Sequence, residues 1–182
     1  MPINKTVTPE ARLSFPHLFE PNSFRDSDPK YSATLLFPKG TDLKPLKKLA
    51  AAAVKEKWGD NPPKNLRNPF RDGSEKELEG YEGVTFITAS SKKRPGVVDQ
   101  QVQPILDADE IYAGCYVRAS VTAFCYGGKG TAITPGVSFG LQNVQKIRDG
   151  EPFSGRSKPE DDFDTVEVEE TKTEEDAEEL PF

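Results

Sequence analysis

The stretch from Gly114 to Tyr126 alternates strictly between two kinds of side chain. One set is small and apolar: Cys115, Val117, Ala119, Val121, Ala123 and Cys125. The other set combines rings, a guanidinium group and hydroxyls: Tyr116, Arg118, Ser120, Thr122, Phe124 and Tyr126. Because alternate side chains of a strand point to opposite faces, we expect the apolar set to fill a barrel interior. Rings stack on nucleobases of any sequence, at about 1–3 kcal/mol per base. We therefore predict that the outer face contacts single-stranded nucleic acid through Tyr116, Arg118, Phe124 and Tyr126, unless a helix or a dimer partner covers it.

Two further groups of cations are candidates for phosphate contact. The first lies in the long connection 59–83 and surrounds a ring: Lys64, Arg67, Phe70 and Arg71. Cations around an aromatic ring suit a single strand, although the ring of Phe70 could equally pack on the core. The second group is the adjacent set Lys92, Lys93 and Arg94, which repel one another unless an anion lies near them. Lys129 is a further candidate, at the tip of an expected hairpin turn.

Other chemistries are disfavoured by the same sequence. The glycine-rich run 127–131 is not a nucleotide-binding P-loop, because Gly130 stands where a Ser or Thr must follow Lys129. One histidine and the absence of clustered Cys and His spacings argue against a zinc site, and no nucleophile and base are suitably spaced. The two cysteines, ten residues apart in one expected strand, would lie about 34 Å apart, too far for a disulfide. We expect no cofactor and no metal.

The charge of the chain is divided unevenly along its length. Residues 159–182 hold 12 acidic side chains and one lysine, whereas residues 1–158 hold 23 basic and 18 acidic side chains. The net charge of −6 therefore conceals a basic body, which indicates a polyanion as its partner. The tail ends on a short motif that a mere solubility segment does not need: Glu178, Glu179, Leu180, Pro181 and Phe182. We predict that this motif binds a protein partner through the ring and carboxylate of its last residue.

The elements that must position these residues are mostly strands. Sixteen prolines and 14 glycines separate short β-branched and aromatic runs, so we expect a mostly β domain at 1–158 and a disordered acidic tail at 159–182. Strands are predicted at 7–15, 30–37, 84–89, 114–126 and 131–147, the last interrupted at 135–136. One helix is predicted at 41–58, capped by Thr41 and packed on the core by side chains that include Trp58.

Three stretches and the terminus carry a resemblance to known proteins. The ending Glu-Glu-Leu-Pro-Phe resembles that of bacterial single-stranded-DNA-binding proteins, with Leu180 in place of an isoleucine. Segments 30–39, 116–126 and 141–146 resemble a bacteriophage single-stranded-DNA-binding family formerly described as a domain of unknown function. The resemblance implies a five-stranded oligonucleotide/oligosaccharide-binding barrel whose open face takes single strands.

We therefore expect a non-catalytic phage protein that coats single-stranded DNA, without sequence preference, during replication and recombination. Removal of the tail is expected to permit duplex binding, and the tail itself is expected to bind host or phage replication proteins. No apolar run is long enough for a signal peptide or a membrane span, so we expect the cytoplasm of the infected bacterium. Two alternatives remain: a strand-annealing or recombination mediator, and a metal-dependent nuclease or other DNA-processing enzyme that uses acids such as Asp107, Asp109 and Glu110.

Overall fold

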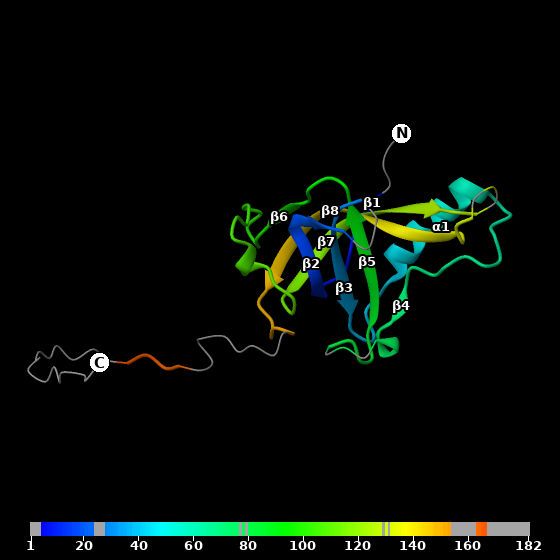
Figure 1. The fold of residues 1–182 in the computed structure, drawn as a ribbon. Helices are drawn as coiled ribbons and strands as arrows, with labels where there is room; N and C mark the ends of the chain where they lie inside the picture. Colours follow the sequence, from blue (N-terminus) through cyan, green and yellow to red (C-terminus); the bar gives the residue numbers. More distant parts are fainter. Residues whose placement is uncertain are drawn as a thin grey trace, which may run out of the picture.

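The computed structural model describes residues 5–23, 28–76, 78, 80–128, 130, 132–153 and 163–166 of the chain (Figure 1). Within these residues eight strands form one sheet: β1 Lys5–Val7, β2 Ala11–Asn22, β3 Lys30–Phe37, β4 Arg71–Asp72, β5 Thr85–Ser91, β6 Gly96–Val98, β7 Tyr116–Tyr126 and β8 Gly136–Arg148. The described helices are α1 Lys44–Trp58 and two short 3₁₀ helices, η1 Gly73–Glu75 and η2 Ala108–Glu110.

Five of the strands close into a barrel. The sheet runs β7-β2-β3-β5-β8, and a long antiparallel pairing of β8 with β7 joins its two ends. All neighbours in this ring are antiparallel except β5 and β8, which run parallel. A closed five-stranded barrel with one parallel pair confirms the expected oligonucleotide/oligosaccharide-binding fold. The short strands β1, β4 and β6 pair with β7, β5 and β8 outside the ring.

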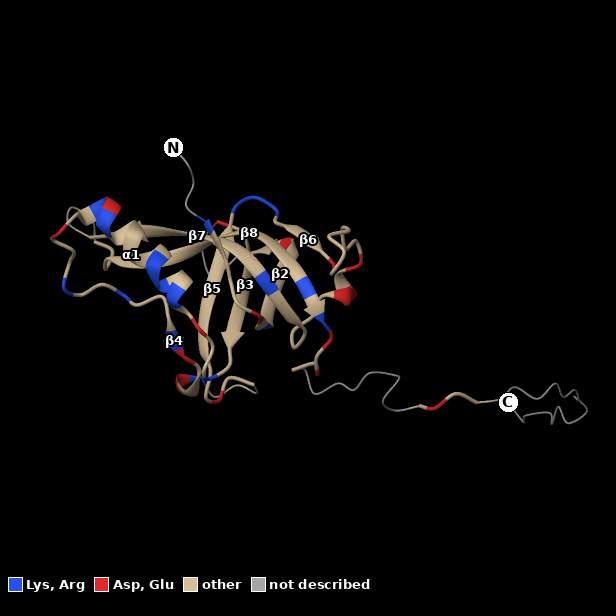
Figure 2. Cartoon of the chain, turned by 180° about the vertical axis from the view of Figure 1, so that it is seen from behind, with Lys and Arg blue, Asp and Glu red and all other residues tan. Residues whose placement is uncertain are grey.

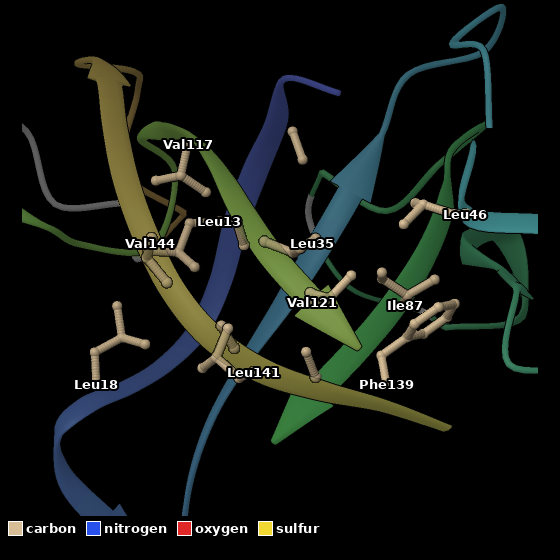
Figure 3. Packing of buried hydrophobic residues seen from close by; sticks show 14 of the residues in the cluster. Leu13, Leu18, Leu35, Leu46, Ile87, Val117, Val121, Phe139, Leu141 and Val144 are labelled. Carbon is tan, nitrogen blue, oxygen red and sulfur yellow. The ribbon is translucent and has the colours of Figure 1, made fainter. Parts of the chain in front are cut away.

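The barrel interior is filled by apolar side chains that alternate along each strand (Figure 3). The alternation predicted for β7 is confirmed, because Val117, Ala119 and Val121 are no more than 1% exposed. Facing them are Leu13 and Leu18 of β2, Leu35 of β3, Ile87 of β5, and Phe139, Leu141 and Val144 of β8. Full burial of such a side chain is worth about 1.5–3 kcal/mol, so this interior is the main stabilising element of the domain.

Helix α1 covers the barrel near β7, β8 and β1, burying Leu46, Leu49 and Ala50. Its predicted start was wrong. The helix begins at Lys44, because the Thr41 hydroxyl donates instead to the Pro38 carbonyl at 2.7 Å.

The prediction that Trp58 belongs to the core was also wrong. This residue ends α1, is half-buried, and lies beside Gly128 and Pro135 at the tip of the β7–β8 hairpin. The ring of Trp58 therefore lies against the end of the β7–β8 hairpin and not against the barrel interior.

The predicted strands differ from the observed ones mainly at their ends. Strand β2 continues to Asn22 rather than stopping at Phe15, because a β-bulge accommodates Phe15 and Pro16 within it. Strand β8 begins at Gly136, so Pro135 precedes the strand and the pair does not interrupt it. The strands β1, β4 and β6 were not predicted, since two or three residues are too few for a periodic pattern.

Candidate nucleic-acid interface

The outer wall of the barrel carries small hydroxyl side chains in register across three strands. Ser14 of β2 pairs with Thr34 of β3, which pairs with Thr88 of β5, and the two threonine hydroxyls lie 3.4 Å apart. A second row places Ser32 of β3 beside Ser90 of β5. Thr88 is exposed and both serines of the second row are half-buried. Ser14 and Thr34 are buried, so the part of this wall that a flat group can approach consists of Thr88 and the second row.

Sequence reasoning missed this wall, although its signal is present. In β3 and β5 hydroxyl residues alternate with the apolar residues Ala33, Leu35, Ile87 and Ala89 that line the interior.

A small apolar cluster covers the lower end of the same wall. Tyr81, from the connection 59–83, is 3% exposed and packs with Leu36 and Phe86, together with Phe153. Its hydroxyl donates to the Ser14 hydroxyl at 2.8 Å. Burial raises the pKa of Tyr81 above its ordinary value. The open part of the wall therefore consists of Thr88, Ser32 and Ser90, which this cluster leaves accessible.

A groove of about 480 Å³ borders the open wall and brings together residues from two distant parts of the chain. Arg67 and Arg71 come from the connection 59–83, whereas Tyr126 ends β7; Thr88 and Ser138 also line the groove. The amide of Arg67 donates to the Pro135 carbonyl at 2.9 Å, which fixes this part of the connection beside the start of β8. Two guanidinium groups and a phenol around a hydroxyl-lined groove can hold phosphates and a base.

Both arginines of the groove are available to a ligand. Each is exposed, and the ion pair between Arg71 and Glu75, at 3.9 Å, is solvent-accessible on both sides. Exposed pairs of this kind are worth about 0–1 kcal/mol, so a phosphate can compete for Arg71. The ring of Phe124 lies nearby, because Phe124 pairs with Ser138, and 43% of its surface is exposed.

Phe70 packs on the core, which is one of the two roles that its sequence position allowed. Its ring meets that of Phe139 edge to face, with centroids 5.7 Å apart, and packs half-buried against the core. This packing accounts for Phe70 without a bound base.

The other predicted residues of β7 lie away from the groove. Tyr116 is eight residues from Phe124, about 26 Å along an extended strand. Its ring centroid lies 4.0 Å from the Arg148 guanidinium carbon and 5.9 Å from that of Arg12. Arg118 donates to the Gln145 side chain at 2.7 Å. These groups form a separate patch near the start of β7.

The three adjacent cations form an arch between β5 and β6, seen as the blue loop at the top of Figure 2. Lys92, Lys93 and Arg94 are all exposed. Lys92 lies 4.0 Å from Asp28, and the guanidinium of Arg94 lies 5.3 Å from the ring centroid of Phe19. Strand β5 thus runs from Thr88, in the groove, past Ser90 to this arch. Arg67 and Arg71 lie at the Thr88 end of this segment, and Lys92, Lys93 and Arg94 lie at its other end.

The remaining predicted site residues divide into two groups. Lys64 is exposed on the connection 59–83, outside the residues that line the groove. Lys129 and the tail residues Glu178, Glu179, Leu180, Pro181 and Phe182 lie outside the described residues.

Other possible centres of chemistry are sparse in the described part of the chain. Three or more His, Cys, Asp or Glu side chains are nowhere grouped there in a way that could hold a metal ion. Neither cysteine forms a disulfide, and burial raises the pKa of both thiols. Among the described residues, no helix is long and apolar enough to cross a membrane.

Comparisons with known proteins point to one family. Residues 4–177 match the family model described as Enterobacter phage Enc34, ssDNA-binding protein. Putative protein p50 of Acyrthosiphon pisum secondary endosymbiont phage 1 is 38% identical over 157 residues, which cover 79% of this chain and 83% of that protein.

Solved structures agree with this match. The single-stranded DNA-binding protein of bacteriophage Enc34, in complex with ssDNA, superposes with a TM-score of 0.69 at 27% identity, over 82% of this chain and 89% of that chain. The single-stranded DNA-binding protein gp2.5 of bacteriophage T7 shares the fold, with a TM-score of 0.56 at 15% identity, over 85% of this chain and 97% of that chain.

Proposed function

The chain belongs to the Enc34 family of phage single-stranded-DNA-binding proteins, and we propose that it binds single-stranded DNA without sequence preference during phage replication and recombination. The observation that carries the proposal is the groove in which Arg67, Arg71 and Tyr126 converge beside the hydroxyl-lined wall. Guanidinium groups bind phosphates and a ring stacks on any base, so neither interaction reads a sequence.

We propose a path for the strand along the outer wall. It enters at the groove, crosses Thr88 and Ser90 of β5, and leaves over the arch Lys92–Arg94. Cations at both ends hold the backbone, and the low hydroxyl side chains between them let bases lie close to the sheet. The path follows the wall that barrels of this fold use for single strands.

In this proposal the protein is a binder without catalytic activity, in the cytoplasm of the infected bacterium. Residues 1–158 form the binding domain. The acidic segment 159–182 competes with DNA for the basic surface and presents Phe182 to replication proteins. This division follows from the charge of the two parts, with 23 basic and 18 acidic residues in the first and 12 acidic residues in the second.

A titration with a fluorescent poly-dT oligomer tests the proposal. We expect saturable binding, and we expect the double variant R67A/R71A to lower the salt slope of the binding constant by about 0.7 for each phosphate that is no longer neutralised. The control is K44A/K48A, which removes the same charge from α1 away from the groove. Equal salt slopes for the two double variants would contradict a phosphate role for the groove.

Two further measurements separate the alternatives. Incubation of labelled DNA with Mg²⁺ or Mn²⁺ would produce fragments only if the protein were a metal-dependent nuclease. Pairing of complementary labelled strands above the spontaneous rate would instead indicate an annealing mediator.

A further inference from the structure

Phe15 is an exposed ring in the middle of a barrel strand. It lies within β2, yet 54% of its surface is accessible to solvent. The interior beside it is filled by Leu13 and Leu18, which are at most 2% exposed. The ring of Phe15 therefore lies outside the barrel. Packing of the described core does not require it.

The backbone at Phe15 is in a conformation that favours glycine. Its φ is +44°, and the next residue is Pro16, which itself disfavours helical conformations at the preceding position. A non-glycine residue held in this region costs on the order of 1–3 kcal/mol. Glycine would make the same turn without that cost.

The strain coincides with a β-bulge that turns side chains onto the outer wall. Ser14 pairs with Thr34 and His17 pairs with Ser32, so β2 uses three steps where β3 uses two. Bulges of this kind redirect a side chain, and they are common near functional sites. Here the redirected side chain is Phe15, between the ends of the two hydroxyl rows. Phe15 thus borders the open wall on the side opposite the groove.

We propose that Phe15 is a base-stacking site for single-stranded DNA, and that the strained bulge holds its ring over the wall. The inference rests on the proposed function and extends it to β2. The proposed path passes Ser90 of β5, and the half-buried second row leads from there across Ser32 of β3 to β2, about 10 Å away at about 4.8 Å per strand. In this proposal Tyr126 and Phe124 contact bases at one side of the wall, and Phe15 contacts a base at the other side.

The structural alternative is that the bulge only bends β2 between its pairings with β3 at Ser14 and at His17. Glycine would serve that purpose at least as well. The variant F15G therefore separates the two roles. If the ring binds DNA, F15G loses affinity for a dT oligomer by roughly 5- to 150-fold, the range that corresponds to one stacked base. Its thermal unfolding temperature stays at or above that of the parent.

Val102 provides a matched control. It is also an exposed non-glycine residue with positive φ, at +61°, but it lies in the loop after β6. V102G should relieve strain in the same way and leave DNA affinity unchanged. F15L serves as a second test that keeps an apolar side chain on the bulge without a ring, and it should also weaken binding.

A spectroscopic measurement reports the stacking directly. In a W58F background, F15W places the only tryptophan of the chain at the bulge, and its fluorescence should be quenched by a saturating dT oligomer. Parent-like affinity of F15G and F15L, or an unquenched F15W that still binds DNA, would overturn the inference while leaving the proposed function intact. Failure of the parent protein to bind the oligomer would refute the proposed function itself.

Discussion

The guanidinium carbon of Arg12 lies 4.2 Å from the ring centroid of Phe153. Phe153 packs against the apolar cluster on the outer wall, and Arg12 also donates to the Gly114 carbonyl at 3.0 Å. The chain after β8 is thereby attached beside the wall proposed to bind DNA. The acidic segment begins only six residues later, at Pro159. Such a short tether gives the tail a high effective concentration at the basic surface.

Removing residues 159–182 should tighten DNA binding and permit binding to duplex DNA. The truncated protein loses the 12 acidic side chains that we propose compete with phosphates. Titrations with single-stranded and duplex oligomers at two salt concentrations measure the effect. Unchanged affinity in both titrations would exclude competition by the tail.

Removing only Phe182 should separate protein recruitment from DNA binding. Nearly all the acidic residues remain, so DNA affinity should change little. Binding of replication proteins should fall strongly, because the ring that we propose as the aromatic anchor is removed. Pull-downs from infected-cell extract with the parent and the shortened chain provide the comparison. An undiminished set of partners would show that the tip is not the anchor.

Substitution of Tyr126 or Phe124 by alanine should weaken DNA binding by about 1–3 kcal/mol for a ring that stacks on a base. Neither ring is part of the buried core, so circular dichroism and thermal unfolding should remain close to those of the parent. Val121→Asp is the opposite control, because it buries a charge in the barrel and should abolish folding. Unfolding of the aromatic variants would indicate a structural role for these side chains.

Neutralising Lys92, Lys93 and Arg94 together should weaken binding equally for oligomers of different sequence. Interactions with phosphate carry no base preference, and the salt slope should fall by about 0.7 for each phosphate that the arch no longer neutralises. The slope is measured by titrating the triple variant at several salt concentrations. A slope equal to that of the parent would mean that the arch does not bind phosphate.

Alkaline pH should destabilise the domain partly through Cys115. Burial raises the pKa of its thiol in the folded protein above the ordinary value of about 8.5. The folded state therefore holds the proton more tightly. This contribution to stability is complete below about pH 8.5 and is lost as the pH rises through the folded pKa.

Urea unfolding at pH 7 and pH 9.5 measures this contribution. The loss of unfolding free energy between the two pH values should be smaller in Cys115→Ala than in the parent. The comparison between pH values removes the cost of the cavity that the substitution leaves. An identical loss in both proteins would assign the pH dependence to other groups.

Several features could be predicted from the sequence because they depend on neighbouring residues. The alternation from Tyr116 to Tyr126 reflects the two-residue period of a strand, and it is confirmed by the burial of Val117, Ala119 and Val121. The mostly β composition and the body of helix α1 follow from equally local patterns. The boundaries of β2 and β8 were predicted less well, because bulges and strand ends depend on the partner strand.

The arrangement of the site depends on the tertiary structure. Arg67 and Tyr126 are 59 residues apart, and only the pairing of Arg67 with the start of β8 brings both to one groove. Phe70 belongs to the same basic cluster in sequence, yet the closure of the barrel offers its ring the edge of Phe139. Phe15 lies outside the barrel because β2 bulges between Ser14 and His17, where its register against β3 shifts. Side-chain types were readable from the sequence, but which of them share a surface was decided by strand pairing across long separations in the chain.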